Sequence, residues 1–445
     1  MEEKNILELI EQKKYIQLKK ELSEMNEVDI SEILDPLELH TTLLIFRMLP
    51  KDMAAEVFSY FSPEQQADII NAVTDKELKF ILDELFFDDM IDLIEEMPAN
   101  IVNKILANST QEERVLINQF LKYPAHSAGS LMTIEYVELK KNMTVKEALD
   151  HIKKIGLDKE TIYTCYVTDY KRKLDGIVSL RTLVVSEPDK NIMDIVFEDV
   201  IYVGTHDDQE TVANIFIKYG FMALPVVDKE HRLTGIITFD DIMDVMEEEA
   251  TEDFQRMAAM MPSEEPYLNS GIIELAKQRI PWLMILMIGA TVTGRIITKF
   301  EDVLSSIVVL TAFIPMLMDT GGNSGSQSST LIIRGLATGD VELKDIWKVL
   351  WKEFRISLVV GFSLAAVNFI KNMLLDRVGL MVSLTVSITV ASAVMLAKIV
   401  GGTLPLIAKK CKLDPAIMAG PLITTIVDAL TLTVYFGIAS ALLIK

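Results

Sequence analysis

A single carboxylate, Asp428, lies within a long apolar run near the end of the chain, DPAIMAGPLITTIVDALTLTVYF. A carboxylate in the middle of a bilayer costs about 3 kcal/mol on insertion scales, and such residues usually mark the path of an ion or substrate. Arg295 and Lys398 are the alternative partners that would make Asp428 a structural residue, but neither is an evident ion-pair partner. A permeating cation is therefore the better candidate.

The stretch MDTGGNSGSQSST, residues 318–330, separates two apolar runs. One interpretation is that its small side chains allow close helix packing. The other is that its backbone carbonyls, with Asn323, Ser326 and Gln327, line a wet path, because irregular backbone is tolerated in a membrane only beside a cavity or other protein. Asp428 favours the second interpretation. Asp319 is either a second acid of this path or a structural residue.

Oxygen donors are what a cation would find within the apolar runs, because this half of the chain contains no histidine and its one cysteine, Cys411, lies in a predicted loop. Oxygen ligands disfavour zinc, copper and other softer metals. Magnesium keeps several of its waters and requires only one or two carboxylates, which fits Asp428 with neighbouring carbonyls and hydroxyls. Sodium, calcium and manganese fit nearly as well by chemistry alone.

Five apolar runs are long enough to cross a bilayer, at roughly 280–298, 303–333, 356–375, 380–408 and 415–443. Lys and Arg gather in the loops after the second and the fourth run, and such loops stay in the cytosol. We therefore expect residues 279–445 to form a five-span domain in the cell membrane, with the N-terminal part cytoplasmic and the C-terminus outside.

The charge of the chain is divided between its two parts. Residues from 279 onward hold 10 acidic and 15 basic side chains, which leaves 55 acidic and 28 basic before them. An acidic soluble part disfavours nucleic acid as a partner and favours cations or simple solubility. We see no Ser-His-Asp, Cys-His or phosphate-binding-loop arrangement, so neither an enzyme nor a protein substrate is predicted.

Two repeats organise the acidic part. Residues 1–122 contain a weak twelve-residue repeat from Arg47, which predicts short helices stacked in a superhelix. Residues 126–250 contain two matching halves of helix, strand, Leu-x-Gly and buried strand, which resemble a tandem pair of CBS modules. Such modules often bind adenine nucleotides. Only the second half has the matching pair, Thr238 and Asp241, so at most one ATP site is predicted.

An acidic segment connects the second module to the membrane. Eight of the fourteen residues from Asp240 to Asp253 are acidic, and their spacing is helical with no breaker before Pro262. Like charges at i and i+4 destabilise a helix by a few tenths of a kcal/mol, roughly, for each pair. A bound cation would relieve this repulsion, so we expect a connecting helix over 240–270.

Together, RIPWLMILMIGATVTGRIITKFEDVL, TGGNSGSQSSTLIIRGLATGDV and the Asp428 run, behind paired CBS modules and an acidic helical domain, resemble the MgtE family of magnesium channels. The resemblance covers nearly the whole chain. It implies a homodimer whose pore lies between the subunits, built by the second and fifth spans. It also implies that segment 240–270 is a plug helix and that magnesium itself gates the pore.

The resemblance also assigns residues by position. For the pore it implies Asp428 as the main ion-binding residue, with Gly322, Asn323, Ser326, Gly420 and Thr424 beside it. Ser326 and Gly420 depart from the family, whose members often have Asn at both positions. For regulatory magnesium it implies a set of cytosolic carboxylates: Glu56, Asp88, Asp92, Asp208, Glu210, Asp241, Asp244, Glu249, Glu252, Asp253 and Asp414.

The hypothesis that results is a self-limiting magnesium channel. At low cytosolic magnesium the acids of facing domains repel each other, at about 1 kcal/mol per pair at 4 Å in water, and the pore opens. At high magnesium, ions bridge these acids and favour the closed state. Two other classes remain open at this point: an ion-coupled secondary transporter of Mg²⁺, Mn²⁺ or Co²⁺, and a membrane-anchored nucleotide sensor.

Overall fold

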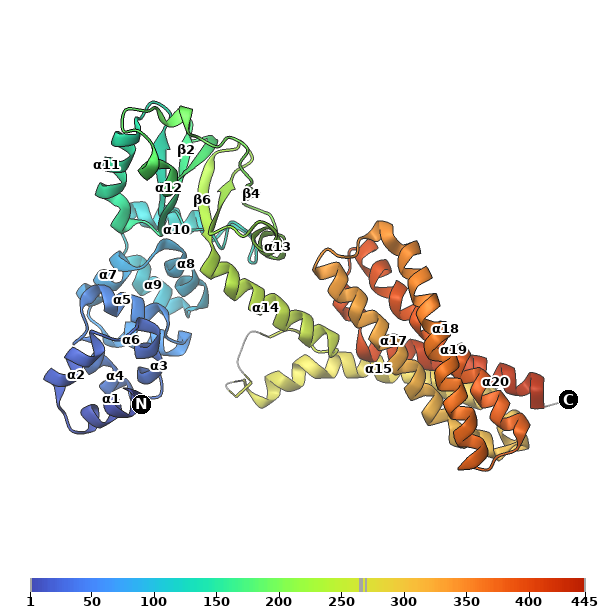
Figure 1. The fold of residues 1–445 in the computed structure, drawn as a ribbon. Helices are drawn as coiled ribbons and strands as arrows, with labels where there is room; N and C mark the ends of the chain where they lie inside the picture. Colours follow the sequence, from blue (N-terminus) through green and yellow to red (C-terminus); the bar gives the residue numbers. More distant parts are fainter. Residues whose placement is uncertain (1, 264–266, 269, 444–445) are drawn as a thin grey trace. The chain divides into compact units, whose positions relative to one another are not determined.

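The computed structural model describes residues 2–263, 267–268 and 270–443. The chain divides into two compact units, Met1–Val245 and Met246–Lys445, which are taken in turn (Figure 1). Residues 264–266 and 269, within the predicted segment 240–270, and residues 1, 444 and 445 at the ends of the predicted domains lie outside the described residues.

The first unit begins with a stack of short helices. They are α1 (Glu2–Glu11), α2 (Tyr15–Leu22), α3 (Glu27–Leu34), α4 (Leu39–Phe46), α5 (Lys51–Ser59), α6 (Pro63–Ala72), α7 (Asp75–Glu84), α8 (Phe87–Glu96), α9 (Ala99–Asn108) and α10 (Gln111–Phe120). From α5 onward each helix begins twelve residues after the one before, which confirms the predicted repeat.

Local sequence explains where these helices begin. Thr74 and Thr110 form capping boxes, in which the threonine side chain and a glutamate three residues later satisfy each other's free backbone N–H groups. Pro50 and Pro98 precede α5 and α9. The apolar residue two positions before each start is buried in most repeats, so one unit packs on the next (for example Leu49, Phe61, Val73 and Met97).

Two α/β modules complete the first unit. The first contains β1 (Tyr136–Lys140), α11 (Val145–Ile155), η1 (Gly156–Asp158), β2 (Thr161–Thr168), β3 (Leu174–Ser179), α12 (Leu180–Val185) and η2 (Ile192–Asp194). The second contains β4 (Val203–Gly204), α13 (Gln209–Tyr219), β5 (Ala223–Val227) and β6 (Leu233–Thr238), and leads into α14 (Phe239–Met257). Both sheets have a parallel pair followed by an antiparallel pair, in the orders β1-β2-β3 and β4-β5-β6.

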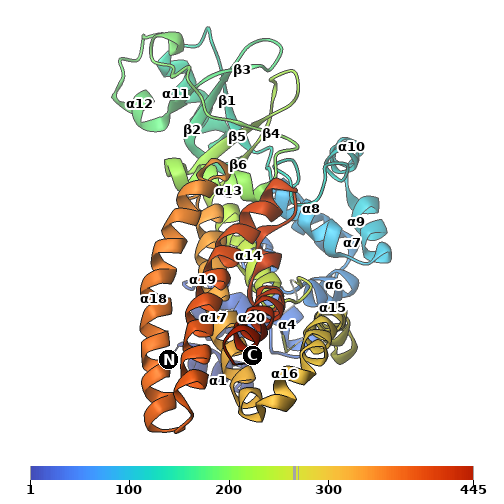
Figure 2. The same cartoon turned by 90° about the vertical axis from the view of Figure 1, so that its right-hand side faces the viewer.

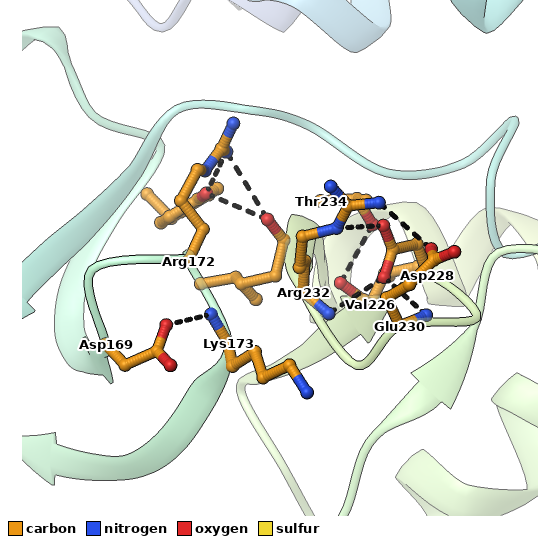
Figure 3. A network of polar contacts seen from close by, with 10 residues as sticks. Asp169, Arg172, Lys173, Val226, Asp228, Glu230, Arg232 and Thr234 are labelled. Atoms are coloured by element: carbon orange, nitrogen blue, oxygen red, sulfur yellow. Dashed lines mark hydrogen bonds and ion pairs between the residues drawn. The ribbon is translucent and has the colours of Figure 1, made fainter.

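The turns after β2 and β5 show how closely the two modules match (Figure 3). Asp169 Oδ1 accepts from the backbone N–H of Lys173 at 2.9 Å, and Asp228 Oδ1 accepts from that of Arg232 at 2.8 Å. The two turns also join, because Leu233 N donates to the carbonyl of Arg172 at 2.9 Å. The predicted internal repeat is thus confirmed down to its turn aspartates.

The second unit is helical. It contains the end of α14, then α15 (Ile272–Lys299), α16 (Glu301–Ser306), η3 (Val308–Phe313), α17 (Ile314–Ala337), η4 (Leu343–Asp345), α18 (Ile346–Leu374), α19 (Leu380–Lys410), η5 (Pro415–Met418) and α20 (Gly420–Leu443). Figure 2 shows α17, α18 and α19 side by side, and α20 contacts α15, α17 and α19.

Within the described residues, four helices are long and apolar enough to cross a membrane: Ile272–Lys299, Leu343–Leu374, Leu380–Lys410 and Gly420–Leu443. The predicted second span, 303–333, is not one continuous helix. The chain breaks around Ile307, whose φ of −139° and ψ of 78° are not helical, and α17 begins only at Ile314. With 24 residues α17 is about 36 Å long, but its small polar residues keep it out of the apolar set.

The acidic connecting helix is shorter than the predicted 240–270. It ends at Met257, five residues before Pro262. Ala259 has a φ of 55°, a left-handed conformation that cannot continue an α-helix. Beyond this point the Gln255 side chain bonds both the N–H and the carbonyl of Ser263, at 2.7 and 3.1 Å, and so fixes the chain after the turn.

Candidate ion path and cation-binding acids

Helix α17 has one polar, accessible face. Asp319, Asn323 and Thr330 are exposed and Ser326 is half-buried, and a spacing of four, seven and eleven residues from Asp319 places all four on one side. Gly321, Gly325 and Ser328 lie on the opposite side and are buried. The small residues of α17 therefore pack against other helices of the second unit, and its oxygen-bearing side chains lie on the accessible surface.

The stretch 318–330 is regular helix throughout, which corrects part of the sequence interpretation. Its backbone carbonyls are used within the helix and do not line a path as irregular backbone would. The predicted side chains Asn323 and Ser326 do lie on the accessible face. The irregular backbone predicted for this stretch occurs earlier in the chain, between α16 and α17.

The glycines of α17 allow α20 to approach. A Cβ added at Gly322 would lie 2.9 Å from Thr424 Cγ2, and one added at Gly321 would lie 2.7 Å from Thr431 Oγ1. Close packing and a polar path are therefore both present on α17, on different faces. This packing brings Thr424 and Asp428, one turn apart on α20, alongside the glycine face.

Asp428 is half-buried on α20 and has no ion-pair partner within the part of the chain that the structure describes. Its carboxylate lies close enough to that of Asp319 for the two charges to repel. Asn323 Nδ2 donates to Asp319 Oδ1 at 3.1 Å. Asp319, Asn323 and Asp428 therefore share one polar region, and Asp319 belongs to it. Gly420, which has a φ of 24°, is the first residue of α20 and precedes Asp428 by about two helical turns.

The first unit contains a separate cluster of carboxylates. Asp88 and Asp92 on α8 and Asp241 at the start of α14, all predicted from the sequence, interact electrostatically. Three further acids belong to the same group: Asp240, which the sequence analysis counted in the acidic segment without assigning it to magnesium, and Asp89 and Glu160, which it missed. Glu160 comes from the loop before β2, and nothing in its local sequence indicates that it would lie near α8 and α14.

Loss of solvent around these carboxylates, followed by repulsion from Asp241 or Asp89, raises their pKa. The pKa of Asp88 is well above its ordinary range, that of Asp92 is about 7, and that of Glu160 is about 8. One oxygen of Glu160 is buried without a hydrogen-bond partner. A region that leaves several carboxylates uncompensated is chemically suited to a cation.

Other predicted acids have local roles. Glu56 is exposed on α5, and its pKa is raised by desolvation and by Glu27 and Asp52. Asp208 caps α13 by accepting from Glu210 N at 3.0 Å.

Thr238 Oγ1 donates to Asp241 Oδ2 at 2.6 Å, so the predicted nucleotide pair lies together. In the first module Ser179 and Thr182 bond each other at 2.9 Å instead.

In the second unit the predicted acids meet around an arginine. Arg256 pairs with Glu252 on α14 and with Asp414, which caps η5. Desolvation and the nearby Asp414 and Glu249 raise the pKa of Asp253 to about 6. Glu249 lies on the same part of α14, whereas Asp244 lies on the earlier part of the helix, in the first unit. The sequence analysis missed Arg256, although it is the only basic residue of that helix.

No group of three or more His, Cys, Asp or Glu side chains within the described ranges is arranged to hold a metal ion. The acids lie near each other but do not converge as complete ligand sets. A cation bound to either group would therefore require small movements or additional water ligands.

Comparisons with known proteins agree on which proteins this chain resembles. Residues 314–438 match a family model described as a divalent cation transporter, residues 25–126 match the MgtE intracellular N domain, and residues 128–187 and 192–248 match the CBS domain. A magnesium transporter MgtE of Thermus thermophilus is 37% identical over 96% of this chain and 95% of its own length. That of Bacillus subtilis is 33% identical over 93% and 94%.

Solved structures are similar to the cytosolic part. The soluble part of a magnesium transporter is 30% identical, covers 56% of this chain and 98% of its own, and has a TM-score of 0.53. The cytosolic domain of the Mg²⁺ channel MgtE in complex with ATP is 36% identical, covers 54% and 98%, and has a TM-score of 0.51.

Proposed function

The chain belongs to the MgtE family of divalent cation transporters, and from this premise we propose that it carries Mg²⁺ inward across the plasma membrane along α17 and α20. The observation that carries the proposal is the polar face of α17, with Asp319 and Asn323, next to the unpaired Asp428. The sequence analysis predicted no enzyme, and the matched family is one of transporters. Its relatives are named as magnesium transporters over almost their full length.

The membrane arrangement proposed here has five spans. Helix α17 is the fifth crossing segment in addition to the four apolar helices, since its polar face would be sheltered from lipid along the path. The basic loops after α17 and α19 favour a cytosolic side for these ends, and therefore a C-terminus outside.

We expect the path to lie between two copies of the chain. The accessible face of α17 carries oxygen donors that a lipid contact would leave unsatisfied, and a second α17 would cover it. In the first unit, exposed apolar side chains on α13 and around the start of α14 are also available to a partner (Ile217, Tyr219, Met222 and Met243). A homodimer accounts for both surfaces.

The proposed gate is closed by cytosolic Mg²⁺ itself. The uncompensated acids of α8, α14 and the loop before β2 repel each other when no cation is bound. Mg²⁺ among them would favour the arrangement in which they are close, by its differential affinity for that state. In the second unit, where Arg256 already pairs with Glu252 and Asp414, Mg²⁺ would add to this attachment at Glu249, Glu252, Asp253 and Asp414.

ATP is proposed as a modulator at the second module. The bond between Thr238 and Asp241 places a hydroxyl and a carboxylate together at the end of β6, as a ribose would require. A related cytosolic domain was solved in complex with ATP. The first module lacks the carboxylate, so one site per chain is expected.

Magnesium flux into liposomes holding the purified chain tests this function. Asp428→Asn should abolish uptake, because it removes the charge while keeping the side-chain volume, whereas Asp302→Asn, an exposed acid of α16, should leave uptake intact. Competition by Ca²⁺, Mn²⁺, Co²⁺ and Na⁺ reports selectivity. Uptake that survives Asp428→Asn would contradict the proposed path, whereas a parent chain that shows no uptake would favour a membrane-anchored nucleotide sensor.

Electrical recording separates a channel from a coupled transporter. In a patch with only a Mg²⁺ gradient, a channel reverses at the Mg²⁺ equilibrium potential. A carrier coupled to protons or Na⁺ reverses elsewhere and shifts when the gradient of the coupled ion is changed.

A further inference from the structure

Three charged or polar side chains meet inside the helical unit, away from the polar face of α17. They are Ser328 on α17, Glu353 on α18 and Lys398 on α19, which are 1%, 6% and 5% exposed. Charged residues at membrane depth are costly and are retained where they have a role. Neither Glu353 nor Lys398 belongs to the ion path described above.

The contacts form a directed chain. Lys398 Nζ donates to Ser328 Oγ at 3.3 Å, because an ammonium group has no acceptor. Ser328 Oγ in turn lies 2.6 Å from Glu353 Oε2 and donates to that oxygen. One serine hydroxyl therefore accepts from the base and donates to the acid, and it connects α17 to both neighbouring helices.

Close backbone packing surrounds this chain. A Cβ added at Gly401 on α19 would lie only 2.2 Å from the carbonyl oxygen of Gly325 on α17. A Cβ added at Gly402 would lie 3.0 Å from Glu353 Cγ. The two glycines let α19 approach α17 and α18 at the level of Ser328, so little slack remains around the bonds.

Ser328 lies on the side of α17 opposite to Asp319, Asn323 and Ser326. Close packing of small residues limits the separation of two helices but leaves rotation about the helix axis less restricted. Two hydrogen bonds of fixed direction to a single short side chain do restrict that rotation. The face that α17 presents to the path therefore depends on the bonds behind it.

We propose that Glu353 and Lys398 are positioning residues for ion selection, which act through Ser328 to fix the rotation of α17 and so the direction of Asp319, Asn323 and Ser326. The inference rests on the proposed function, since it assumes that ions pass along α17. No catalytic or ligand role is assigned to either charged residue.

Ser328→Ala is the sharpest test, because it removes both bonds between helices and adds no volume; it also removes a long contact of 3.4 Å to the Ser324 carbonyl of its own helix. Ser357→Ala is the matched control: this serine is also 1% exposed, but it bonds only the Phe354 carbonyl of its own helix, at 2.7 Å. In liposomes, Ser328→Ala should raise the ratio of Ca²⁺ to Mg²⁺ flux at least fivefold. Ser357→Ala should leave this ratio unchanged.

Glu353 is tested with a conservative pair of variants. Glu353→Gln keeps an oxygen that accepts from Ser328 and should retain most of the discrimination, whereas Glu353→Ala should lose it as Ser328→Ala does. If Ser328→Ala and Glu353→Ala lower only protein yield or melting temperature, and the ion ratio stays at the parent value, the residues are merely structural and the proposal is overturned.

A second measurement does not require transport. In a Cys411→Ser background, whose other cysteine, Cys165, is buried, Asn323→Cys places one accessible thiol on the polar face of α17. Its rate of modification by a water-soluble methanethiosulfonate reagent should change at least fivefold with Ser328→Ala and stay constant with Ser357→Ala. An equal rate in all three proteins would overturn the inference even if Asp428→Asn abolishes flux; flux that survives Asp428→Asn would instead overturn the proposed function.

Discussion

The guanidinium group of Arg256, in the last turn of α14, bonds the carboxylate of Asp414, which caps η5. The same group pairs with Glu252. Met257, the next residue, packs on Ile333, Ala416 and Ala419. The end of the acidic helix is therefore attached to the membrane unit by a side chain of this protein, at the place where sequence analysis predicted only carboxylates and magnesium.

Replacing this arginine should make the attachment depend on magnesium. Arg256→Gln leaves Glu252, Asp253 and Asp414 without their basic partner, so the end of α14 should lose about 2 kcal/mol of stability, the usual range for bonds between charged groups. Limited proteolysis within residues 258–263 should be faster without Mg²⁺ and should return toward the parent rate when Mg²⁺ is added. Lys277→Gln is an exposed control with the same change of charge. Equal Mg²⁺ dependence in both variants would argue against the idea.

The acid cluster of the first unit predicts an unusual pH dependence. The pKa of Asp92 is raised to about 7 and that of Glu160 to about 8, so these groups bind more protons in the folded than in the unfolded chain between pH 4 and 8. Stability should therefore fall as pH rises through this range. A carboxylate with a lowered pKa, such as Glu77 at about 2, acts in the opposite direction near its unfolded value of 4.5, but it is ionised in both states at higher pH and adds no slope there.

Thermal unfolding of the full chain in detergent with a chelator checks this dependence. The melting temperature should decrease from pH 5 to pH 8, Glu160→Gln should flatten the decrease, and added Mg²⁺ should flatten it further by occupying the cluster. A melting temperature that rises over this interval in the parent protein would be inconsistent with the cluster.

Gly401 should be among the least tolerant positions of the helical unit. Gly401→Ala would push a Cβ to 2.2 Å from the carbonyl oxygen of Gly325, and backbone cannot move aside as a side chain can. Overpacking of this kind costs roughly 1–3 kcal/mol or more. Gly437→Ala meets nothing within 4 Å and should be neutral or slightly stabilising, since alanine favours helix. Thermal unfolding in detergent compares the two, and similar melting temperatures would count against the packing described here.

Ser326→Asn tests the departure from the family pattern. The side chain is half-buried on the polar face of α17, so an amide oxygen there should provide an additional ligand and lower the half-saturating Mg²⁺ concentration for flux a few-fold. Ser305→Asn, the same change at an exposed residue of α16, is the control and should have little effect. If both variants change flux alike, position 326 has no special role in the path.

ATP binding should depend on the second module alone. Thr238→Ala removes the hydroxyl that bonds Asp241, and a lost hydrogen bond of about 1 kcal/mol weakens binding several-fold. Calorimetric titration of the full chain with ATP measures this change. Ser179→Ala, the equivalent position of the first module, should bind as the parent does. Weaker binding in Ser179→Ala would move the site to the other module.

Periodic features could be predicted from the sequence, and features that depend on distant contacts could not. The twelve-residue repeat and the two CBS modules follow from local apolar spacing and turn residues, such as Asp169 and Asp228, which act within a few residues of themselves. Asp428 could be recognised because it is isolated among apolar residues. These signals are local, and the structure preserves them.

Glu160 and Arg256 could not be found in the same way. Glu160 joins the cluster only because the loop before β2 lies near α8 and α14, a long-range contact that no spacing indicates.

The end of α14 was placed too late because Ala259 adopts a left-handed conformation that is uncommon for alanine. The regular helix over 318–330 was misjudged because glycine and serine were read as breaks, whereas packing against α20 stabilises them as helix.

The twelve-residue spacing of α5 to α10 has a mechanical consequence. Helices of this stack contact mainly those two places further along, such as α5 with α7 and α7 with α9. In a stack of this kind each repeat depends on the interfaces with its near neighbours and not on one shared core. A change in the position of the acids on α8 should therefore pass through the N-terminal domain from one helix to its near neighbours, and should not require the whole domain to unfold or rearrange at once.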